Sequence, residues 1–194
     1  MPTLEWIGKS KVINHHQDVP FRVLERKYSF DENGQHNEDN GSENMIIRGD
    51  NLEALKALLP RYEGRVKCIY IDPPYNTGAK DWKYNNDYVD SSDAYRHSKW
   101  LSMMEKRLKI AKKLLNPKDS VMIVTIDEKE YLHLGCLLEE IFSGETMQMV
   151  SITINPSGAK RDNLFSRSDE YAYIILFGNA QVIHPKGNGN EREV

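Results

Sequence analysis

The sequence predicts an α/β fold, with a mostly parallel sheet and an N-terminal arm. An antiparallel strand at one edge of the sheet is compatible with the pattern. Apolar runs of strand length alternate with segments whose apolar residues recur every three or four positions, as in amphipathic helices. The chain has 194 residues, 39% of them hydrophobic, which is enough for one sizeable core. Strands separated by helices imply right-handed crossovers and parallel pairing.

The chain divides into four segments. Residues 31–44, DENGQHNEDNGSEN, contain no strongly apolar side chain, so we expect a flexible linker or surface loop there. Residues 1–30 form an arm that alternates apolar and basic side chains, and 30 residues alone seldom make a core, so we expect it to pack on the body. The body is residues 45–180, and residues 181–194 are a polar tail.

The first half of the body contains two predicted strands and one predicted helix. Residues 45–48, MIIR, predict a short strand, after which Asp50 caps a helix that Pro60 closes. Residues 66–71 predict a second strand, which Pro73 and Pro74 stop.

The second half begins with a polar, aromatic-rich loop that ends near residue 92. Ser92 or Asp93 then caps a long helix with apolar residues at steps of three and four. The remaining predicted elements are a nearly all-apolar strand at 121–126, a helix at about 128–142, and strands near 147–154 and 171–177.

Composition narrows the function classes. No apolar run approaches the roughly 18 residues needed to cross a bilayer, and the first residues lack a hydrophobic signal core, so we expect no membrane partner. Cys68 and Cys136 lie outside any C-x-x-C, which fits reduced thiols and a cytoplasmic location. A net charge of −3 gives no global nucleic-acid signal. No metal site is predicted, because His15 and His16 lack partners at ligand spacing.

The most informative residues follow the strand at 66–71. Ligands of open α/β sheets bind beyond the carboxyl ends of the strands, where the sequence puts Asp72. An ionised Asp72 offers only acceptors, Pro73 contributes a carbonyl, and Tyr75 a flat aromatic face. Two fixed acceptors beside a stacking platform suit a planar base that carries an amino group.

Such a site could help an aromatic amino group react. The amino lone pair is delocalised into the ring, and acceptors on its hydrogens would localise it and stabilise the positive charge that grows during attack on an electrophile. Flipping a base out of a duplex costs a few kcal/mol, which stacking at about 1–3 kcal/mol can largely offset. A plain D-P-P turn with a packed tyrosine remains the alternative.

The sequence around this motif resembles a known family. D-P-P-Y after an apolar strand is the catalytic motif of adenine amino methyltransferases that act on DNA with S-adenosylmethionine. With its flanks, among them IIRGDNLEALKALLP, IDPPYNTG and NPSGAKRDNLFSRSDEYAYIILFG, the chain resembles the modification (Mod) subunit of type III restriction–modification systems. These subunits are beta-class N6-adenine methyltransferases with a Rossmann-like sheet, of which this chain would form part.

The resemblance implies a role for each matching residue. Asp72 and the Pro73 carbonyl would hold the adenine amino group, and Tyr75 would stack on the flipped base. Pro74, Asn76 and Thr77 would bind substrate, although Asn76 and Thr77 could equally serve to form a turn. Asp50 and Asn51 resemble the acidic turn near the cofactor adenine, although Asp50 could equally be a helix N-cap.

The chain also departs from the family pattern. A glycine-rich F-x-G-x-G cofactor turn is not found, since residues 177–180, FGNA, lack the second glycine. A target-recognition region is not found either. We therefore expect an N-terminal catalytic segment that neither methylates DNA alone nor binds S-adenosylmethionine with micromolar affinity. The resemblance implies DNA, a restriction (Res) subunit and a second Mod copy as partners.

Two other readings remain open. The chain could be a non-catalytic remnant or scaffold module that retains subunit contacts. A methyltransferase for RNA or for a protein amide is disfavoured by Asp72, because glutamine methylation is associated with Asn at that position.

Overall fold

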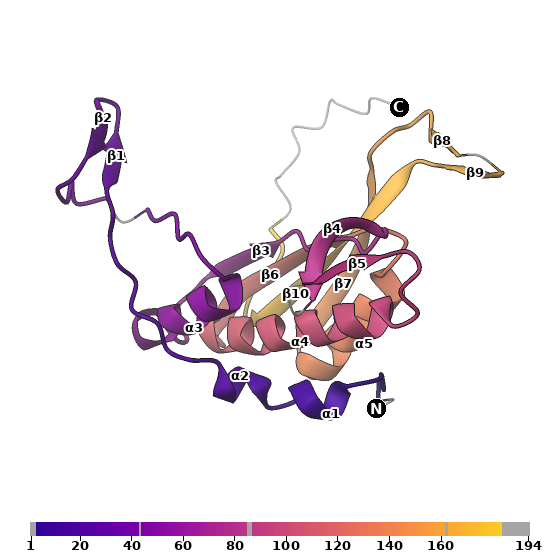
Figure 1. The fold of residues 1–194 in the computed structure, drawn as a ribbon, viewed down its shortest axis with the longest axis horizontal. Helices are drawn as coiled ribbons and strands as arrows, with labels where there is room; N and C mark the ends of the chain where they lie inside the picture. Colours follow the sequence, from indigo (N-terminus) through magenta and orange to yellow (C-terminus); the bar gives the residue numbers. More distant parts are fainter. Residues whose placement is uncertain (1–2, 43, 85–86, 162, 184–194) are drawn as a thin grey trace.

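The central sheet has four strands in the order β3-β6-β10-β7 in the computed structural model, which describes residues 3–42, 44–84, 87–161 and 163–183 (Figure 1). β3 (Cys68–Ile71) is parallel to β6 (Asp119–Ile126), whereas β10 (Asp169–Gly178) runs antiparallel to both β6 and β7 (Thr146–Thr153). The α/β class is confirmed. The antiparallel part of the sheet is larger than the single edge strand that the sequence allowed, because β10 is antiparallel to both of its neighbours. The cause is that no helix lies between β7 and β10 in the described chain, so the chain returns in the opposite direction.

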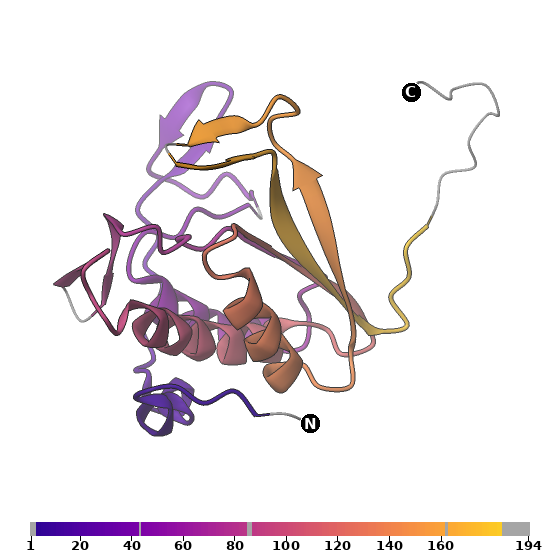
Figure 2. The same cartoon turned by 90° about the vertical axis from the view of Figure 1, so that its right-hand side faces the viewer.

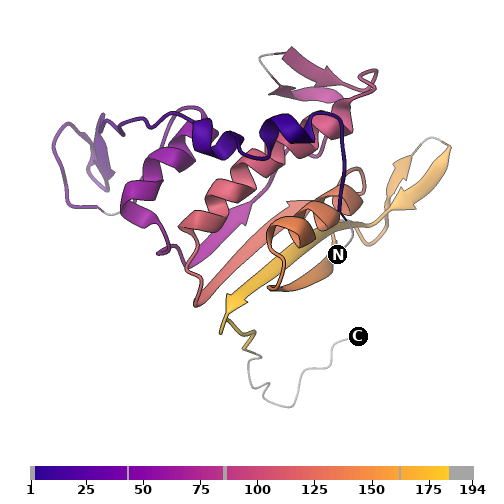
Figure 3. The same cartoon turned by 90° about the horizontal axis from the view of Figure 1, so that it is seen from below.

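Three helices cover one face of this sheet: α3 (Asn51–Tyr62), α4 (Arg96–Leu114) and α5 (Tyr131–Ile141) (Figures 2 and 3). On β6, side chains alternate between fully buried positions, such as Met122 and Val124, and half-buried ones, such as Val121 and Ile123. The buried set packs against the fully buried Trp100 of α4. The core therefore lies between the sheet and the helices.

The opposite face of the sheet has no helix over it within the described residues (Figure 2). Half-buried Ile174 and Leu176 lie there on β10, and Tyr70 of β3 is 64% exposed. Within the described part of the chain, this apolar sheet face thus has no covering layer of helices, and it is called the uncovered face below.

The prediction of a strand at residues 45–48 is wrong. These residues form no strand, and Ile46 is fully exposed. A strand needs a neighbour to satisfy its backbone groups, and no described strand lies alongside this segment.

Two predicted helix boundaries also differ from the structure. α3 continues through Pro60 to Tyr62, since Pro60 falls in the last turn. α4 begins at Arg96 with no side-chain cap, because the Asp93 carboxylate accepts from the Tyr95 N–H in the turn before it.

The N-terminal arm packs against α4 through its two short helices, α1 (Lys9–Val12) and α2 (His15–Asp18). The Trp6 indole N–H donates to the Ser102 hydroxyl at 2.9 Å, and Lys109 Nζ donates to the Ile13 carbonyl at 2.6 Å. Ser102 and Lys109 of α4 therefore help to hold the arm on the body.

Three hairpins project from these layers. The expected linker contains part of the first, β1 (Ser29–Asp31) with β2 (Gly34–His36), which extends from the body (Figure 1). The others are β4 (Ala79–Tyr84) with β5 (Asp87–Asp90), and β8 (Ala159–Arg161) with β9 (Leu164–Arg167). Most of the expected tail, from residue 184 on, lies outside the described residues. Within the described part, no helix is long and apolar enough to cross a bilayer.

Candidate active site at the carboxyl end of β3

β3 delivers Asp72 to the edge of the sheet where the parallel strands β3 and β6 both end. The register pairs Ile71 with Val124, so the next residue of β6, Thr125, lies beside Asp72. The Thr125 hydroxyl donates to Asp72 Oδ1 at 2.8 Å, while the Asp72 side chain stays exposed. The carboxylate is therefore oriented by the neighbouring strand and remains open to a ligand.

The two prolines connect Asp72 to the helical layer. Pro73 is buried, and the Pro74 carbonyl accepts a hydrogen bond from the Trp100 indole N–H at 2.6 Å. Because Trp100 is fully buried in the core, this contact fixes the backbone of the motif on α4.

Tyr75 lies half-buried beside two carboxylates. Its hydroxyl donates to Glu170 Oε2 at 3.4 Å. Burial raises the pKa of Tyr75 to about 12, and the negative charges of Asp72 and Glu170 add to the increase. The phenol therefore stays neutral at physiological pH.

A group of charged side chains completes this edge of the sheet. Arg167 Nη2 lies 2.8 Å from Glu170 Oε1, and Arg167 Nη1 lies 3.5 Å from Asp127 Oδ2. Burial raises the pKa of the Asp127 carboxyl, which Arg167 opposes. The sequence pattern did not assign Asp127, Glu170 or Thr125 to the site, whereas Arg167 was a candidate for phosphate contact in a loop between strands. One signal was available: Asp127 directly follows the strand predicted at 121–126, which ends beside the strand that carries Asp72.

Asn76 and Thr77 differ in their surroundings. Asn76 is 1% exposed and adopts a left-handed φ of 58°, which an Asn tolerates in a turn. Its amide N–H donates to the Glu130 carboxylate, and its amide oxygen accepts from the Trp82 indole at 3.2 Å. Both ends of the Asn76 amide are thus engaged by the protein, whereas Thr77 is exposed. Their predicted contact with substrate stays a prediction.

Asp50 and Asn51 lie at the start of α3. Asp50 Oδ1 accepts from the backbone N–H groups of Leu52 and Glu53 at 2.9 and 3.2 Å, so Asp50 is the N-cap. Asn51 Oδ1 accepts from Arg107 Nε at 2.6 Å. The cofactor role of both residues stays a prediction.

A cavity of about 290 Å³ opens beside Asp50. It is lined by Asp50, Leu52, Lys83, Tyr84, Met103, Lys106 and Arg107. Three cations against one carboxylate disfavour a sulfonium group in this cavity. The residues that line this cavity therefore do not fit the sulfonium of S-adenosylmethionine, whereas its uncharged adenine, which the resemblance places near Asp50, meets no such repulsion.

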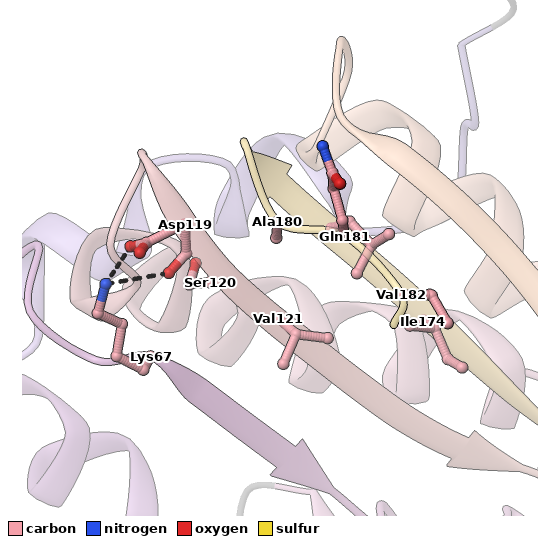
Figure 4. Close-up of a pocket in the computed structure, with 9 residues that line it drawn as sticks. Lys67, Asp119, Ser120, Val121, Ile174, Ala180, Gln181 and Val182 are labelled. Carbon is pink, nitrogen blue, oxygen red and sulfur yellow. Dashed lines mark hydrogen bonds and ion pairs between the residues drawn. The ribbon is translucent and has the colours of Figure 1, made fainter. Parts of the chain in front are cut away.

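A larger cavity, of about 360 Å³, lies on the uncovered face of the sheet. Val121, Ile174 and Val182 line it, and the Lys67–Asp119 ion pair closes one end (Figure 4). Asp119 begins β6 and Thr125 lies near its end, which puts the Asp72 site about 20 Å away at the rise of an extended strand. This cavity is separate from the candidate site.

The mixed sheet and the Asp-Pro-Pro-Tyr sequence at the end of β3 define a methyltransferase-type α/β domain. The chain belongs to the DNA methylase family, whose N6_N4_Mtase model matches residues 66–183. It is 33% identical over 196 residues to the type III restriction-modification enzyme EcoPI Mod subunit of Escherichia phage P1. That match covers 89% of this chain and 30% of the relative.

A second Mod subunit is similar in sequence, and one solved structure is similar in fold. The probable type III restriction-modification enzyme HindVI Mod subunit of Haemophilus influenzae is 44% identical over 116 residues, which cover 60% of this chain and 14% of the relative. The crystal structure of the M1.HpyAVI-SAM complex has the same fold, with a TM-score of 0.50 and 17% identity over 76% of this chain and 60% of that one. The chain thus spans less than a third of the length of these two Mod subunits.

Proposed function

We propose that this chain carries the adenine-holding part of a DNA methyltransferase of a type III restriction–modification system. The complete protein would transfer a methyl group from S-adenosylmethionine to the N6 atom of a flipped adenine. One observation carries the proposal: Asp72 is exposed at the carboxyl end of β3, is oriented by Thr125, and is followed by a backbone held by Trp100. The similarity to two Mod subunits supports the type III assignment.

In the proposed mechanism, Asp72 and the Pro73 carbonyl accept the two hydrogens of the adenine amino group. These acceptors localise the N6 lone pair and stabilise the positive charge that develops on N6 as the new N–C bond forms. Tyr75 stacks on the flipped base, and its neutral hydroxyl adds no charge to the site. After methylation N6 carries one proton too many, which Asp72 can accept and pass to water.

S-adenosylmethionine would supply the electrophilic methyl group. The cavity beside Asp50 is a poor match for its sulfonium, so we propose that further polypeptide completes the cofactor site. Two observations support an incomplete domain: the uncovered apolar face of the sheet, and the much greater length of the Mod subunits. We further propose that DNA, a Res subunit and a second Mod copy are partners of the complete protein.

The test uses this chain joined to a C-terminal half that restores methylation. Asp72→Ala should lower the methylation rate by at least about 100-fold, as expected when a transition-state hydrogen bond to a developing charge is lost. The unfolding midpoint should change little, because Asp72 is exposed.

The matched control is Glu139→Ala, which removes an exposed carboxylate from α5, on the helical side of the sheet, and should retain activity. Full activity of Asp72→Ala would contradict the assigned role. Labelled donor incubated with DNA, RNA and protein substrates separates the methyltransferase classes. Failure of every C-terminal half to restore methylation would favour the scaffold alternative.

A further inference from the structure

Glu130 lies at the centre of a hydrogen-bonded cluster that none of the roles above uses. Its side chain is fully buried at the N-terminal end of α5. It is contacted by His97 Nδ1 of α4 at 2.7 Å and by His133 Nδ1 of α5 at 2.7 Å. A third contact comes from the amide of Asn76, in the turn that follows the Asp-Pro-Pro-Tyr motif.

The chemistry of this cluster fixes its protonation pattern. With Glu130 as a carboxylate, which only accepts, each imidazole presents an N–H at Nδ1. The Asn76 amide is oriented in the same way, with its N–H toward Glu130 and its oxygen toward Trp82. A continuous chain of hydrogen bonds therefore runs from the two histidines through Glu130 to Trp82.

A metal ion explains these distances less well. The three side chains can offer ligand atoms within 4.8 Å of one another. Two ligands of one zinc ion, each about 2.0–2.2 Å from it in a tetrahedral arrangement, lie about 3.3–3.6 Å apart. The two separations of 2.7 Å are those of hydrogen bonds instead.

We propose that Glu130 is a positioning residue that couples the protonation of the His133 imidazole to the turn at Asn76, and so to the backbone of the Asp-Pro-Pro-Tyr motif. The inference rests on the proposed function for the meaning of that motif. Asn76 directly follows Tyr75, and its left-handed backbone is held by the buried contact to Glu130. A change in charge at the histidine would thus reach the residues that hold the base.

The surroundings make Glu130 the charged partner of both rings. On α4 and the turn before it, Asp93 pairs with Lys99, and Arg96 donates to the Ser91 carbonyl. Before α5, Lys129 lies 3.6 Å from Glu128, and Asp127 lies beside Arg167. On the motif loop and β4, Glu130 is met by the uncharged Asn76, which Trp82 holds.

The direction of the pH effect follows from this contact. The hydrogen bond to Glu130 raises the pKa of His133 above its usual value. A raised pKa in the folded state means that the stabilisation is complete below the unfolded-state value of 6.5 and is lost as the pH rises through the folded-state pKa. The contribution of the His133–Glu130 contact to the stability of this cluster, and so to the turn at Asn76, should therefore be largest at mildly acidic pH.

The experiment reads the three tryptophan indole N–H signals of this chain by NMR during a pH titration. The Trp82 indole reports on Asn76 and the Trp100 indole on Pro74. The Trp6 indole of the arm donates to Ser102 of α4 and serves as the internal control. The Trp82 signal should shift with the same midpoint as the His133 ring, and the Trp6 signal should not. A Trp82 signal that stays constant through the His133 titration would overturn the proposal.

A pair of variants provides a second, independent test. Glu130→Gln should lower the His133 midpoint, abolish the titration of the Trp82 signal and speed Trp82 indole exchange by about tenfold, the effect of losing one hydrogen bond. Glu139→Gln, at an exposed position on the same helix, should change none of these. Unchanged behaviour of Glu130→Gln would overturn the proposal, and if this variant does not fold, the wild-type titration alone decides. Because no readout depends on methyl transfer, failure here is distinguishable from failure of the proposed function.

Discussion

Asp72 and Tyr75 share one short segment but depend on different parts of the molecule. Asp72 is exposed and oriented by Thr125 of β6, whereas Tyr75 is half-buried and donates to Glu170 of β10. Neither Thr125 nor Glu170 is near the motif in the sequence. The motif determines which residue types are at the site. The orientation of the Asp72 and Tyr75 side chains is determined by contacts from β6 and β10.

Tyr75 should act through its ring and not through its hydroxyl. In the complemented protein, Tyr75→Ala should lower methylation efficiency by about 5- to 150-fold, the equivalent of 1–3 kcal/mol of lost stacking. Tyr75→Phe keeps the ring and should stay within about tenfold of the wild type, because the hydrogen bond that it loses, to the Glu170 carboxylate, is long at 3.4 Å. Equal losses in the two variants, measured as kcat/KM for DNA, would contradict the stacking role.

At the scale of elements, the arm is held to the body by a few buried polar contacts. Lys9 of α1 is 6% exposed, and its ammonium lies 2.7 Å from Glu140 Oε1 at the end of α5. It also donates to the Leu4 carbonyl at 2.6 Å. The sequence predicted that the arm packs on the body, but a buried lysine is not visible in an alternation of apolar and basic residues.

Lys9→Ala should loosen the arm. Removal of the ammonium leaves the half-buried Glu140 carboxylate without this partner and should cost about 1–3 kcal/mol of unfolding free energy. Lys11→Ala, on the same helix but exposed, should cost less than about 0.5 kcal/mol. Urea denaturation measures both, and equal stabilities of the two variants would contradict the role of Lys9.

On the scale of the whole molecule, the described helices cover only one face of the sheet. The two faces of β10 differ at adjacent residues: Ile175 is fully buried under the helices, and Ile174 is half-buried on the uncovered face. A complete doubly covered sheet would bury both. In the proposed complete protein, we expect this face to contact the additional polypeptide.

A matched pair of alanine variants tests this layering. Ile175→Ala should lower the unfolding free energy of the chain by about 2–5 kcal/mol, because it opens a cavity in the core. Ile174→Ala should cost less than about 1 kcal/mol in the isolated chain, because its side chain already contacts solvent. Chemical denaturation provides both values, and a similar loss at the two positions would mean that both faces are covered.

The sequence by itself determined the α/β class, the succession of the main strands and helices, and the motif that places Asp72 after a strand. These are local properties, since hydrophobic periodicity and proline stops act over a few neighbouring residues. One local prediction was wrong: residues 45–48 have the composition of a strand but pair with no described strand.

The tertiary structure alone decided which residues meet Asp72-Pro73-Pro74-Tyr75. Thr125, Trp100 and Glu130 lie 25 or more positions from the motif, and Glu170 lies further still. Their contacts depend on strand register and helix packing, which no local pattern encodes. The antiparallel return of β10 was also a tertiary outcome, because pairing between distant strands is settled only when the sheet forms.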